Sequence, residues 1–524
     1  MKKFVSFMLC LLAFSVASAQ VTTSSMSGHV QDEQGAPVVG ALVLATHTPS
    51  GTEYSAIVDG TGNYRIMNMR SGGPYSVKVS MLGFQTVLNE GINIALGDNY
   101  ILDVTLPIES TDLDEVVVTG TRSSILNSDR SGVATNINNR QLNVLPTVSR
   151  SISDFTRLTP QAGNSGSFGG RDTRYNNVSI DGAAFAQRFG LSTSNNYPGG
   201  DAQPISLDAI QEISVNLTPF DIRQSNFTGA NINAVTKSGD NSYHATAYTF
   251  QRFKSMTGDR VQDATVANAK TTSRQTYGAS VGGPIIKNKL FFFINGELEY
   301  KSFLGNQWQP STDGVGSAEN KISQTTIADL ERVSDYLQKT YGYNPGAYQN
   351  FGNSAADNYK IMARIDWNIS KNHKLMVRYN DVKSQDDNLV SGASTPAGVR
   401  LNNNGRNSIN SISFANTGYK QENRVRSITA ELNSVFSPKV SNKLLASFTN
   451  INDTRKTDGD LFPFVDIMKL SNDGKTYEGY MSFGTEIFSF NNGVLNNTFN
   501  ITDNVTIGLG QHTLTAGLSY ENQH

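Results

Sequence analysis

The feature that most constrains this chain is an alternation of apolar and polar residues in its second half. Between residues 358 and 369 the apolar set is Tyr359, Ile361, Ala363, Ile365, Trp367 and Ile369, and the polar set is Lys360, Arg364, Asp366 and Asn368. The pattern recurs at 290–301, 374–380 and 513–520. Because successive side chains of a strand point to opposite faces, each segment is predicted to be a β-strand with one apolar face.

The lengths of the connections separate a membrane barrel from a soluble sandwich. Candidate strands pair across short turns at 284–288, 370–372, 437–439 and 510–511, whereas long polar stretches occupy 254–273, 302–357, 381–423 and 452–496. Short turns at one end and long loops at the other are typical of an outer-membrane β-barrel, whose strand number is even in single-chain bacterial proteins. We count about nine strands, so we expect an incomplete transmembrane antiparallel β-barrel and a C-terminally truncated chain.

The N-terminus predicts export. Lys2 and Lys3 precede an apolar run at 4–14, and Ala17-Ser18-Ala19 is a small-residue cleavage site, so we expect a cleaved signal peptide over 1–19. Cys10, the only cysteine, lies inside it, which leaves the mature chain without disulfides. No later window holds the roughly 18 apolar residues that a membrane helix needs. The formal net charge of -2 gives no support for a nucleic-acid partner.

Residues 20–107 predict a small, separate β-sandwich. Short β-type runs alternate there with Gly turns, as in sandwich domains. The pattern resembles the carboxypeptidase-regulatory-like domain, a seven-stranded β-sandwich. The matching residues are Gly28, Asp32, Gly35, Pro37, Gly40, Ala41, Asp59, Gly62, Tyr64, Gly83 and Phe84. A zinc peptidase needs several converging His and Glu ligands, and His29 and His47 form no paired ligand motif, so we expect a structural role.

A polar linker with three consecutive valines follows at 108–122. β-branched residues hold a chain extended, and an extended exposed segment can add as an edge strand to another protein's sheet. From the residues alone, a plain linker strand remains the alternative. The segment resembles the TonB box of Bacteroidota transporters, which implies that Val116, Val117 and Val118 pair with TonB. The residues that carry this resemblance are Asp114, Glu115, Val116, Val117, Val118, Thr119 and Gly120.

Residues 123–240 change character and are dense in Asn, Gly and Ser. We expect one or two short helices within 142–158. This stretch resembles the small α+β plug of TonB-dependent receptors, and 219–239 is similar to the plug end of their Oar-like subgroup. The resemblance implies a strand that ends in Asp181-Gly182 and a strand at 210–216. Most metallophore and vitamin receptors have a Gly-Pro turn and a Gly-Gly pair where this chain has Thr218-Pro219 and Ala230-Asn231, and this departure favours a cargo other than a siderophore.

The plug motif also contains charged residues that could act together. These are Arg171, Arg174, Asp181 and Arg223, with Gly182 beside them. They could form a charge cluster that holds the plug in the lumen and releases it on demand. Ordinary polar packing in a wet lumen, where exposed ion pairs contribute about 0–1 kcal/mol each, explains them equally well.

Taken together, the chain resembles a TonB-dependent outer-membrane receptor or transporter of the Oar-like subgroup. The resemblance implies an all-β-dominated fold with a signal peptide (1–19), sandwich (20–107), linker with TonB box (108–122), plug (123–240) and the first part of a barrel (241–524). In the full-length protein it implies about 22 strands, as in plugged transporters. The implied location is the outer membrane of a Gram-negative cell.

The implied function is energised uptake of a large or scarce substrate, such as a peptide, protein or other nutrient. The implied partners are the TonB C-terminal domain with its inner-membrane energising complex, outer-membrane lipid and, as a candidate, a surface lipoprotein. No catalytic motif, metal site or cofactor site is evident, so we expect no enzyme. A surface adhesin or a signalling receptor without transport is the alternative, and a passive porin would need neither the plug nor the linker.

Overall fold

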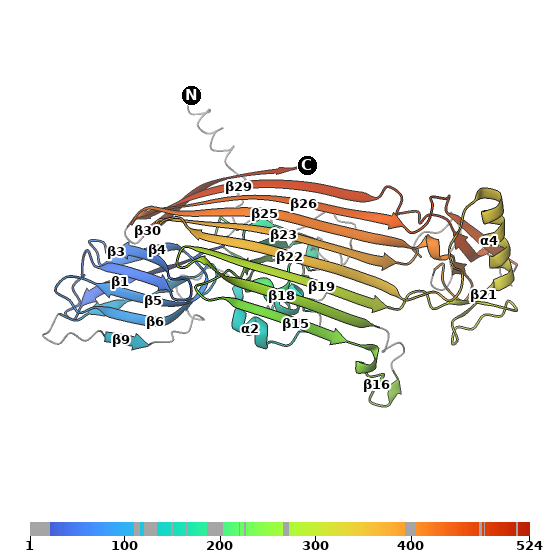
Figure 1. The fold of residues 1–524 in the computed structure, drawn as a ribbon, viewed down its shortest axis with the longest axis horizontal. Coiled ribbons are helices and arrows are strands. Elements are labelled where there is room, and N and C mark those ends of the chain that lie inside the picture. The colour runs from blue at the N-terminus through green and yellow to red at the C-terminus, as the bar shows by residue number, and fades with distance from the viewer. Residues whose placement is uncertain are drawn as a thin grey trace, which may run out of the picture.

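The structure, a computed structural model, consists mainly of strands arranged in three units (Figure 1). A sandwich comes first, a plug follows, and a long antiparallel sheet ends the chain. The predicted signal peptide at 1–19 lies outside the described residues. The described residues are 21–108, 116–119, 134–147, 150–163, 166–185, 203–219, 221–224, 227–265, 272–392, 405–470, 474–475, 477–509 and 512–524.

The sandwich is built from two facing sheets. One has the order β4-β1-β7, with β8 also on β1, and the other has the order β3-β2-β5-β6-β9. The bounds are β1 Ser24–Asp32, β2 Leu42–His47, β3 Thr52–Ile57, β4 Asn63–Met69, β5 Gly72–Ser80, β6 Val87–Ile94, β7 Asn99–Ile101, β8 Val104–Leu106 and β9 Val116–Thr119. Because β7 and β8 pair with β1 in one continuous parallel register, they count as one interrupted strand. Without β9, which belongs to the linker, the sandwich therefore has the predicted seven strands.

Alternation explains how the sandwich forms its core. In β5, Tyr75, Val77 and Val79 are fully buried between the sheets, while Lys78 faces outward. Gly28 in β1 lies so close to the chain that follows β7 that a Cβ would meet the Leu102 carbonyl oxygen at 1.9 Å. Glycine is therefore required at this position by the close backbone approach.

The plug is a five-stranded sheet with short helices. Its order is β10-β13-β14-β11-β12. The bounds are β10 Ala134–Asn138, α2 Asn139–Val144, α3 Ile152–Thr156, η2 Thr173–Tyr175, β11 Asn177–Ile180, β12 Ala183–Ala184, η3 Leu207–Ala209, β13 Ile210–Asn216 and β14 Asn231–Thr236. The predicted strand at 210–216 and the strand before Asp181-Gly182 are both present. The two short helices are also present, although α2 begins three residues before the predicted window because Asn138 caps it by accepting from the Gln141 amide.

Nine long strands form the third unit, in agreement with the sequence count. Their order is β15-β18-β19-β22-β23-β25-β26-β29-β30, all antiparallel, and the sheet is open, with β15 and β30 at its edges. The bounds are β15 His244–Arg252, β18 Ser273–Ile286, β19 Leu290–Phe303, β22 Ser354–Asn368, β23 His373–Asn388, β25 Tyr419–Ser437, β26 Val440–Thr457, β29 Gly493–Leu509 and β30 His512–Gln523.

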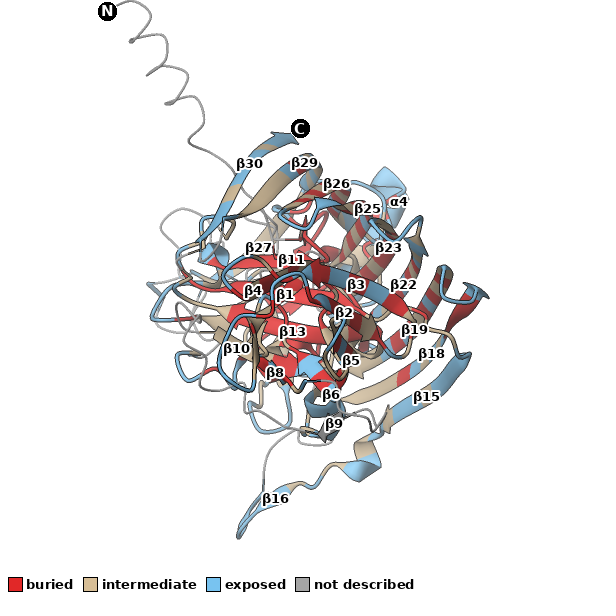
Figure 2. Ribbon diagram, turned by 90° about the vertical axis from the view of Figure 1, so that its left-hand side faces the viewer, coloured by how far each residue is buried: buried red, intermediate tan, exposed pale blue. Residues whose placement is uncertain are grey.

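The burial pattern of this sheet is the reverse of that in a soluble protein. In β19, Ile294 and Leu298 are each 46% exposed, whereas Glu297 and Glu299 are only 6% and 5% exposed. Figure 2 shows the sheet curving along one side of the buried plug and sandwich strands. The concave face is therefore polar and covered, and the convex face is apolar and uncovered, as in a transmembrane barrel.

The long connections differ from the expected loops. They lie at the end of the sheet far from the sandwich and form a packed cap (Figure 1). The cap core is Leu330, Leu337, Tyr343, Ile412, Phe414, Met481 and Phe483. The remaining elements are η4 Lys254–Met256, β16 Arg260–Val261, β17 Ala264–Thr265, β20 Gln309–Ser311, β21 Ile322–Thr326, α4 Ile327–Tyr341, β24 Ile412–Ser413, η5 Ala415–Thr417, β27 Val465–Leu470 and β28 Tyr477–Phe483. Because three separate connections supply this core, no single stretch shows the periodicity that would have predicted it.

The sandwich lies at the short-turn end of the sheet (Figure 1). Asn368 Nδ2, at the end of β22, donates to Thr52 Oγ1 of the sandwich at 3.0 Å, and the Asn241 amide donates to the Pro49 carbonyl at 3.0 Å. The sandwich therefore meets the barrel wall at the short-turn end. None of the helices in the described ranges is both long enough and apolar enough to cross a membrane.

Candidate functional site

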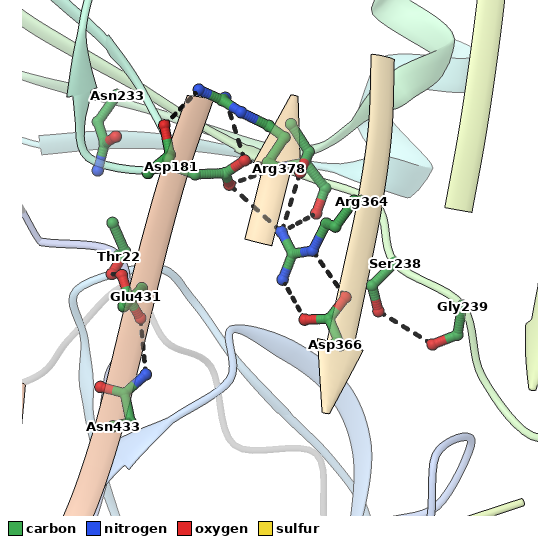
Figure 3. Close-up of polar contacts among 12 residues, drawn as sticks. Thr22, Asp181, Asn233, Ser238, Gly239, Arg364, Asp366, Arg378, Glu431 and Asn433 are labelled. Carbon is green, nitrogen blue, oxygen red and sulfur yellow. Dashed lines mark hydrogen bonds and ion pairs between the residues drawn. The ribbon is translucent and has the colours of Figure 1, made fainter. Parts of the chain in front are cut away.

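The plug is fixed to the barrel wall through Asp181. This residue follows β11 in a turn with φ 44°, and it is 1% exposed. Its carboxylate accepts from the Thr236 amide at 2.9 Å and from Thr236 Oγ1 at 2.7 Å, which ties the turn to the end of β14. It also pairs with Arg364 Nη1 at 3.4 Å and Arg378 Nη1 at 3.2 Å, on β22 and β23 (Figure 3). One plug carboxylate is thus held by two guanidinium groups of the wall.

Both arginines have further partners that fix their position. Arg364 forms a bidentate pair with Asp366, at 2.8 Å and 2.7 Å, and donates to the Thr236 carbonyl at 3.1 Å. Arg378 is fully buried and donates to Thr429 Oγ1 at 3.1 Å. Bidentate carboxylate binding and low exposure make these charge-assisted bonds strong and directional. We call Asp181, Arg364, Asp366 and Arg378 the plug clamp.

Gly182 allows the clamp turn to approach its neighbours. It has φ 78°, a conformation that L side chains rarely adopt. A Cβ at Gly182 would meet Leu445 Cδ2 at 2.8 Å and Thr22 Cγ2 at 3.2 Å. A larger residue would therefore strain the backbone and push the turn away from β26.

The first residues of the sandwich reach the same junction. Thr22 donates to Glu431 and accepts from Lys443, and the Val21 carbonyl accepts from the Asn233 side chain of the plug. Lys443 Nζ lies 3.5 Å from Glu431. Figure 3 shows Thr22 and Glu431 beside the plug clamp. Sandwich, plug and wall thus share one polar junction.

Glu212 of β13 joins the plug to the sandwich. It is 3% exposed, and it accepts from the Leu96 amide at 2.9 Å. Burial raises the pKa of Glu212 to about 7, and repulsion from Asp98 adds to the rise. This carboxyl therefore changes charge near neutral pH.

A second set of plug contacts lies further along the wall. Ser206 donates to Glu297 at 2.8 Å and lies 3.0 Å from the Tyr248 hydroxyl. Glu297 is itself paired with Lys360 at 2.6 Å. Asn380 donates to the Pro204 carbonyl at 3.1 Å. The plug is consequently held at two places by side chains of the concave face.

A small cavity lies at the junction of the three units. Its volume is about 80 Å³, and its lining includes Arg70 of the sandwich, Asp181 and Gln211 of the plug, and Arg364 of the wall. Ligand pockets are usually about 300–1,000 Å³. This cavity therefore suits a few water molecules and not a cargo. Within the described ranges, no three His, Cys, Asp or Glu side chains are grouped so that they could hold a metal ion.

The other charged residues of the predicted plug motif do not join Asp181. Arg171 is exposed. Arg174 pairs with Asp172 at 3.1 Å on the surface, and Arg223 pairs with its neighbour Asp221 at 2.6 Å. Among the ion pairs of the described residues, Asp181 is the one of these four that pairs with the wall. Its two partners, Arg364 and Arg378, were visible in the sequence only as polar positions of alternating strands.

The predicted TonB box lies partly outside the described residues. Asp114, Glu115 and Gly120 belong to the undescribed part. The backbone of Val116–Thr119 forms β9, which pairs in parallel with β6 of the sandwich. The segment is thus extended, as predicted. It is the last strand of a sandwich sheet, a position that the sequence did not suggest.

Comparison with known proteins agrees with this architecture. Residues 25–107 match the carboxypeptidase regulatory-like domain, and residues 235–302 and 300–524 match the outer membrane beta barrel domain. The chain belongs to this outer-membrane β-barrel family, and its combination of units is that of a TonB-dependent receptor. It is 28% identical over 302 residues to the TonB-dependent transporter Oar of Myxococcus xanthus. The matched region covers 54% of this chain and 27% of that protein. The chain therefore spans about a quarter of the length of this curated relative.

Two solved structures are similar to part of this chain. The outer membrane transporter YddB from Escherichia coli has a TM-score of 0.48 and 11% identity, over 74% of this chain and 47% of that chain. The ferric enterobactin receptor PfeA from Pseudomonas aeruginosa, a mutant in complex with enterobactin, has a TM-score of 0.43 and 13% identity, over 76% of this chain and 50% of that chain.

Proposed function

We propose that the full-length receptor takes up a large or scarce nutrient, such as a peptide or protein, across the outer membrane, and that Val116–Thr119 couples this uptake to TonB. The observation that carries the proposal is the placement of this extended strand between the sandwich and the clamped plug. A pull on the strand would be transmitted along the chain to the plug. The Oar relative, a TonB-dependent transporter by name, supports the same reading.

The plug clamp supplies the element that such a pull would act on. The buried carboxylate of the plug and its two guanidinium partners on the wall hold the plug in place at rest. Separating the carboxylate from the guanidinium groups leaves an uncompensated buried charge, at a cost of about 3–5 kcal/mol. Displacement of the plug therefore needs an external source of work. TonB, driven by the inner-membrane energising complex, is the partner that we propose provides it.

The test compares two substitutions at Val117 in the full-length receptor. Val117→Pro removes a backbone N–H and fixes φ, so it should prevent strand pairing. Val117→Thr keeps the N–H and the β-branch and is the matched control. At equal surface levels, we expect the Pro variant to bind cargo from outside and to lose uptake, while the Thr variant retains it.

The same experiment separates transport from the alternative functions. A surface adhesin or a signalling receptor without transport would have no need of strand pairing with TonB. Equal uptake or equal cargo-dependent growth by the Pro and Thr variants would therefore contradict the coupling role of Val116–Thr119.

A further inference from the structure

The edge of the sandwich already holds the proposed coupling strand. β9 pairs with β6 in a parallel register in which Val87 lies opposite Val116 and Glu90 lies opposite Thr119. The other edge of β6 pairs with β5. β6 is therefore an interior strand of a five-stranded sheet only because β9 covers its outer edge.

The path of the chain favours this pairing. Phe84 forms an isolated bridge with Ile108, and the Gln85 amide donates to the Pro107 carbonyl at 2.8 Å, so the chain leaves the sandwich beside the start of β6. Only seven residues separate Ile108 from Val116. So short a tether gives an effective local concentration on the order of mM or more, which lets even a short parallel pairing form.

The position of β9 at the end of the sheet leaves its second edge available. In the part of the chain that the structure describes, β9 pairs with β6 alone. Figure 1 shows β9 on the side of the sandwich away from the long barrel strands β25 and β26. An edge strand presents a row of unpaired N–H and C=O groups, onto which another extended chain can add.

We propose that the sandwich presents Val116–Thr119 as a preformed edge strand, and that the periplasmic energising partner adds a strand of its own to the outer edge of β9. The sheet β3-β2-β5-β6-β9 then continues into the partner. This inference rests on the proposed function, because it assumes that Val116–Thr119 is the coupling segment. It adds that the accessory sandwich is part of the docking surface.

Preorganisation is the physical reason for such an arrangement. A free segment loses backbone entropy when a partner orders it, whereas a segment that is already extended on β6 has lost that entropy before the partner arrives. The sandwich is itself held at the barrel end through contacts such as Asn368 to Thr52. The partner would thus meet a positioned strand at the mouth of the barrel.

A disulfide across the β6–β9 pair tests the proposal. Leu88 lies opposite Val117, and neighbouring strands are about 4.7–4.9 Å apart, within the Cα separation of about 4.4–6.8 Å that a disulfide needs. Within residues 1–524 the single cysteine is Cys10, which lies in the predicted signal peptide. In purified full-length L88C/V117C receptor, oxidation should form the crosslink, and binding of the soluble TonB C-terminal domain should be unchanged or up to several-fold tighter than in the reduced form.

The matched control locks the sandwich without touching β9. Lys78 lies opposite Leu88 across β5 and β6, so K78C/L88C places a disulfide inside the sandwich. Its oxidation should leave the affinity for the TonB domain the same as in its reduced form. Any general effect of a crosslink on the receptor would appear in both variants.

Two results would overturn the proposal. If oxidised L88C/V117C binds the TonB domain at least tenfold more weakly and recovers on reduction, β6 hides the strand from its partner instead of presenting it. If the crosslink does not form in folded receptor, β9 is not held on β6. Failure of the proposed function is distinguishable, because Val117→Pro would then bind the TonB domain and support uptake as well as Val117→Thr does.

Discussion

The sandwich and the barrel sheet use the same alternation of residues in opposite ways. In β5 of the sandwich, Val77 is fully buried and Lys78 is exposed. In β22 of the barrel sheet, Ile361 is 46% exposed, whereas Lys360 and Arg364 are only 4% and 7% exposed. The period of two predicts a strand in both cases. Which face is covered depends on what packs against the strand, and that is the facing sheet in the sandwich and the plug and sandwich in the barrel sheet.

The comparison also explains where the charged residues of the wall find their partners. A buried charge must be paired, and in the barrel sheet the partners come from the wall itself and from the plug. Lys360 of β22 pairs with Glu297 of the adjacent strand β19, and Arg364 and Arg378 pair with Asp181 of the plug. The sandwich core, by contrast, is apolar, and the buried His47 is hydrogen-bonded to Ser50.

The largest expected effect comes from breaking the plug clamp. Asp181→Ala would leave Arg364 and Arg378 without their shared plug carboxylate, and we expect a loss of about 3–5 kcal/mol in the free energy of unfolding of the plug. Urea titration of the full-length receptor measures this free energy, with the protease sensitivity of the plug as the signal for unfolding. The control is Arg174→Ala, whose exposed pair should contribute at most about 1 kcal/mol. Equal losses in the two variants would contradict the clamp.

The contrast between the two apolar faces can be tested with lysine substitutions at equally exposed positions. Ile361 of the barrel is 46% exposed and Ile57 of the sandwich is 51% exposed. Ile361→Lys should cost about 2–4 kcal/mol of folding free energy in lipid vesicles, because the charge would face the bilayer. Ile57→Lys should change it by about 0.5 kcal/mol or less, because that face meets water. Similar costs at both positions would mean that β22 does not face lipid.

A smaller effect than the loss of the clamp is a pH dependence at the boundary between plug and sandwich. The pKa of Glu212 is raised from 4.5 to about 7 in the folded chain. The folded state therefore binds more protons at Glu212 than the unfolded state between these values, so the contribution of Glu212 to stability is highest below pH 4.5 and falls as the pH rises toward 7. Between pH 5 and 6.5 we expect this contribution to fall by about 2 kcal/mol. Glu212→Gln should remove this slope in urea titrations of the full-length receptor.

His47 of the sandwich should give the opposite slope. Burial, assisted by repulsion from Arg70, lowers the pKa of His47 from 6.5 to about 3. The unfolded chain then binds more protons between these values, so the contribution of His47 is present above pH 6.5 and is lost as the pH falls toward 3. The difference between wild type and Glu212→Gln isolates the plug carboxyl, because His47 is common to both. An unchanged slope in that variant would contradict the raised pKa.

The strands and units followed from local pattern. Alternation predicted about nine barrel strands, and the Gly-punctuated runs predicted the sandwich, whereas the strand before Asp181-Gly182 was implied by the resemblance to the receptor plug. The packed cap at the long-loop end was missed. Its helix α4 has a Thr326 cap and buries Leu330 and Leu337, but the residues that cover it come from connections about 80 and 150 residues further along the chain.

The sequence by itself determined which residues form strands and which strand faces are apolar, because the two faces of a strand depend only on the spacing of its own residues. The tertiary structure decided which charges meet. Asp181 lies 183 residues from Arg364 and 197 residues from Arg378, and nothing in the local pattern distinguishes these arginines from others on the polar faces. The backbone position of Val116–Thr119 beside β6 is likewise a tertiary result. Both depend on which elements pack together, and that is set by the burial of whole faces and not by the spacing within any one strand.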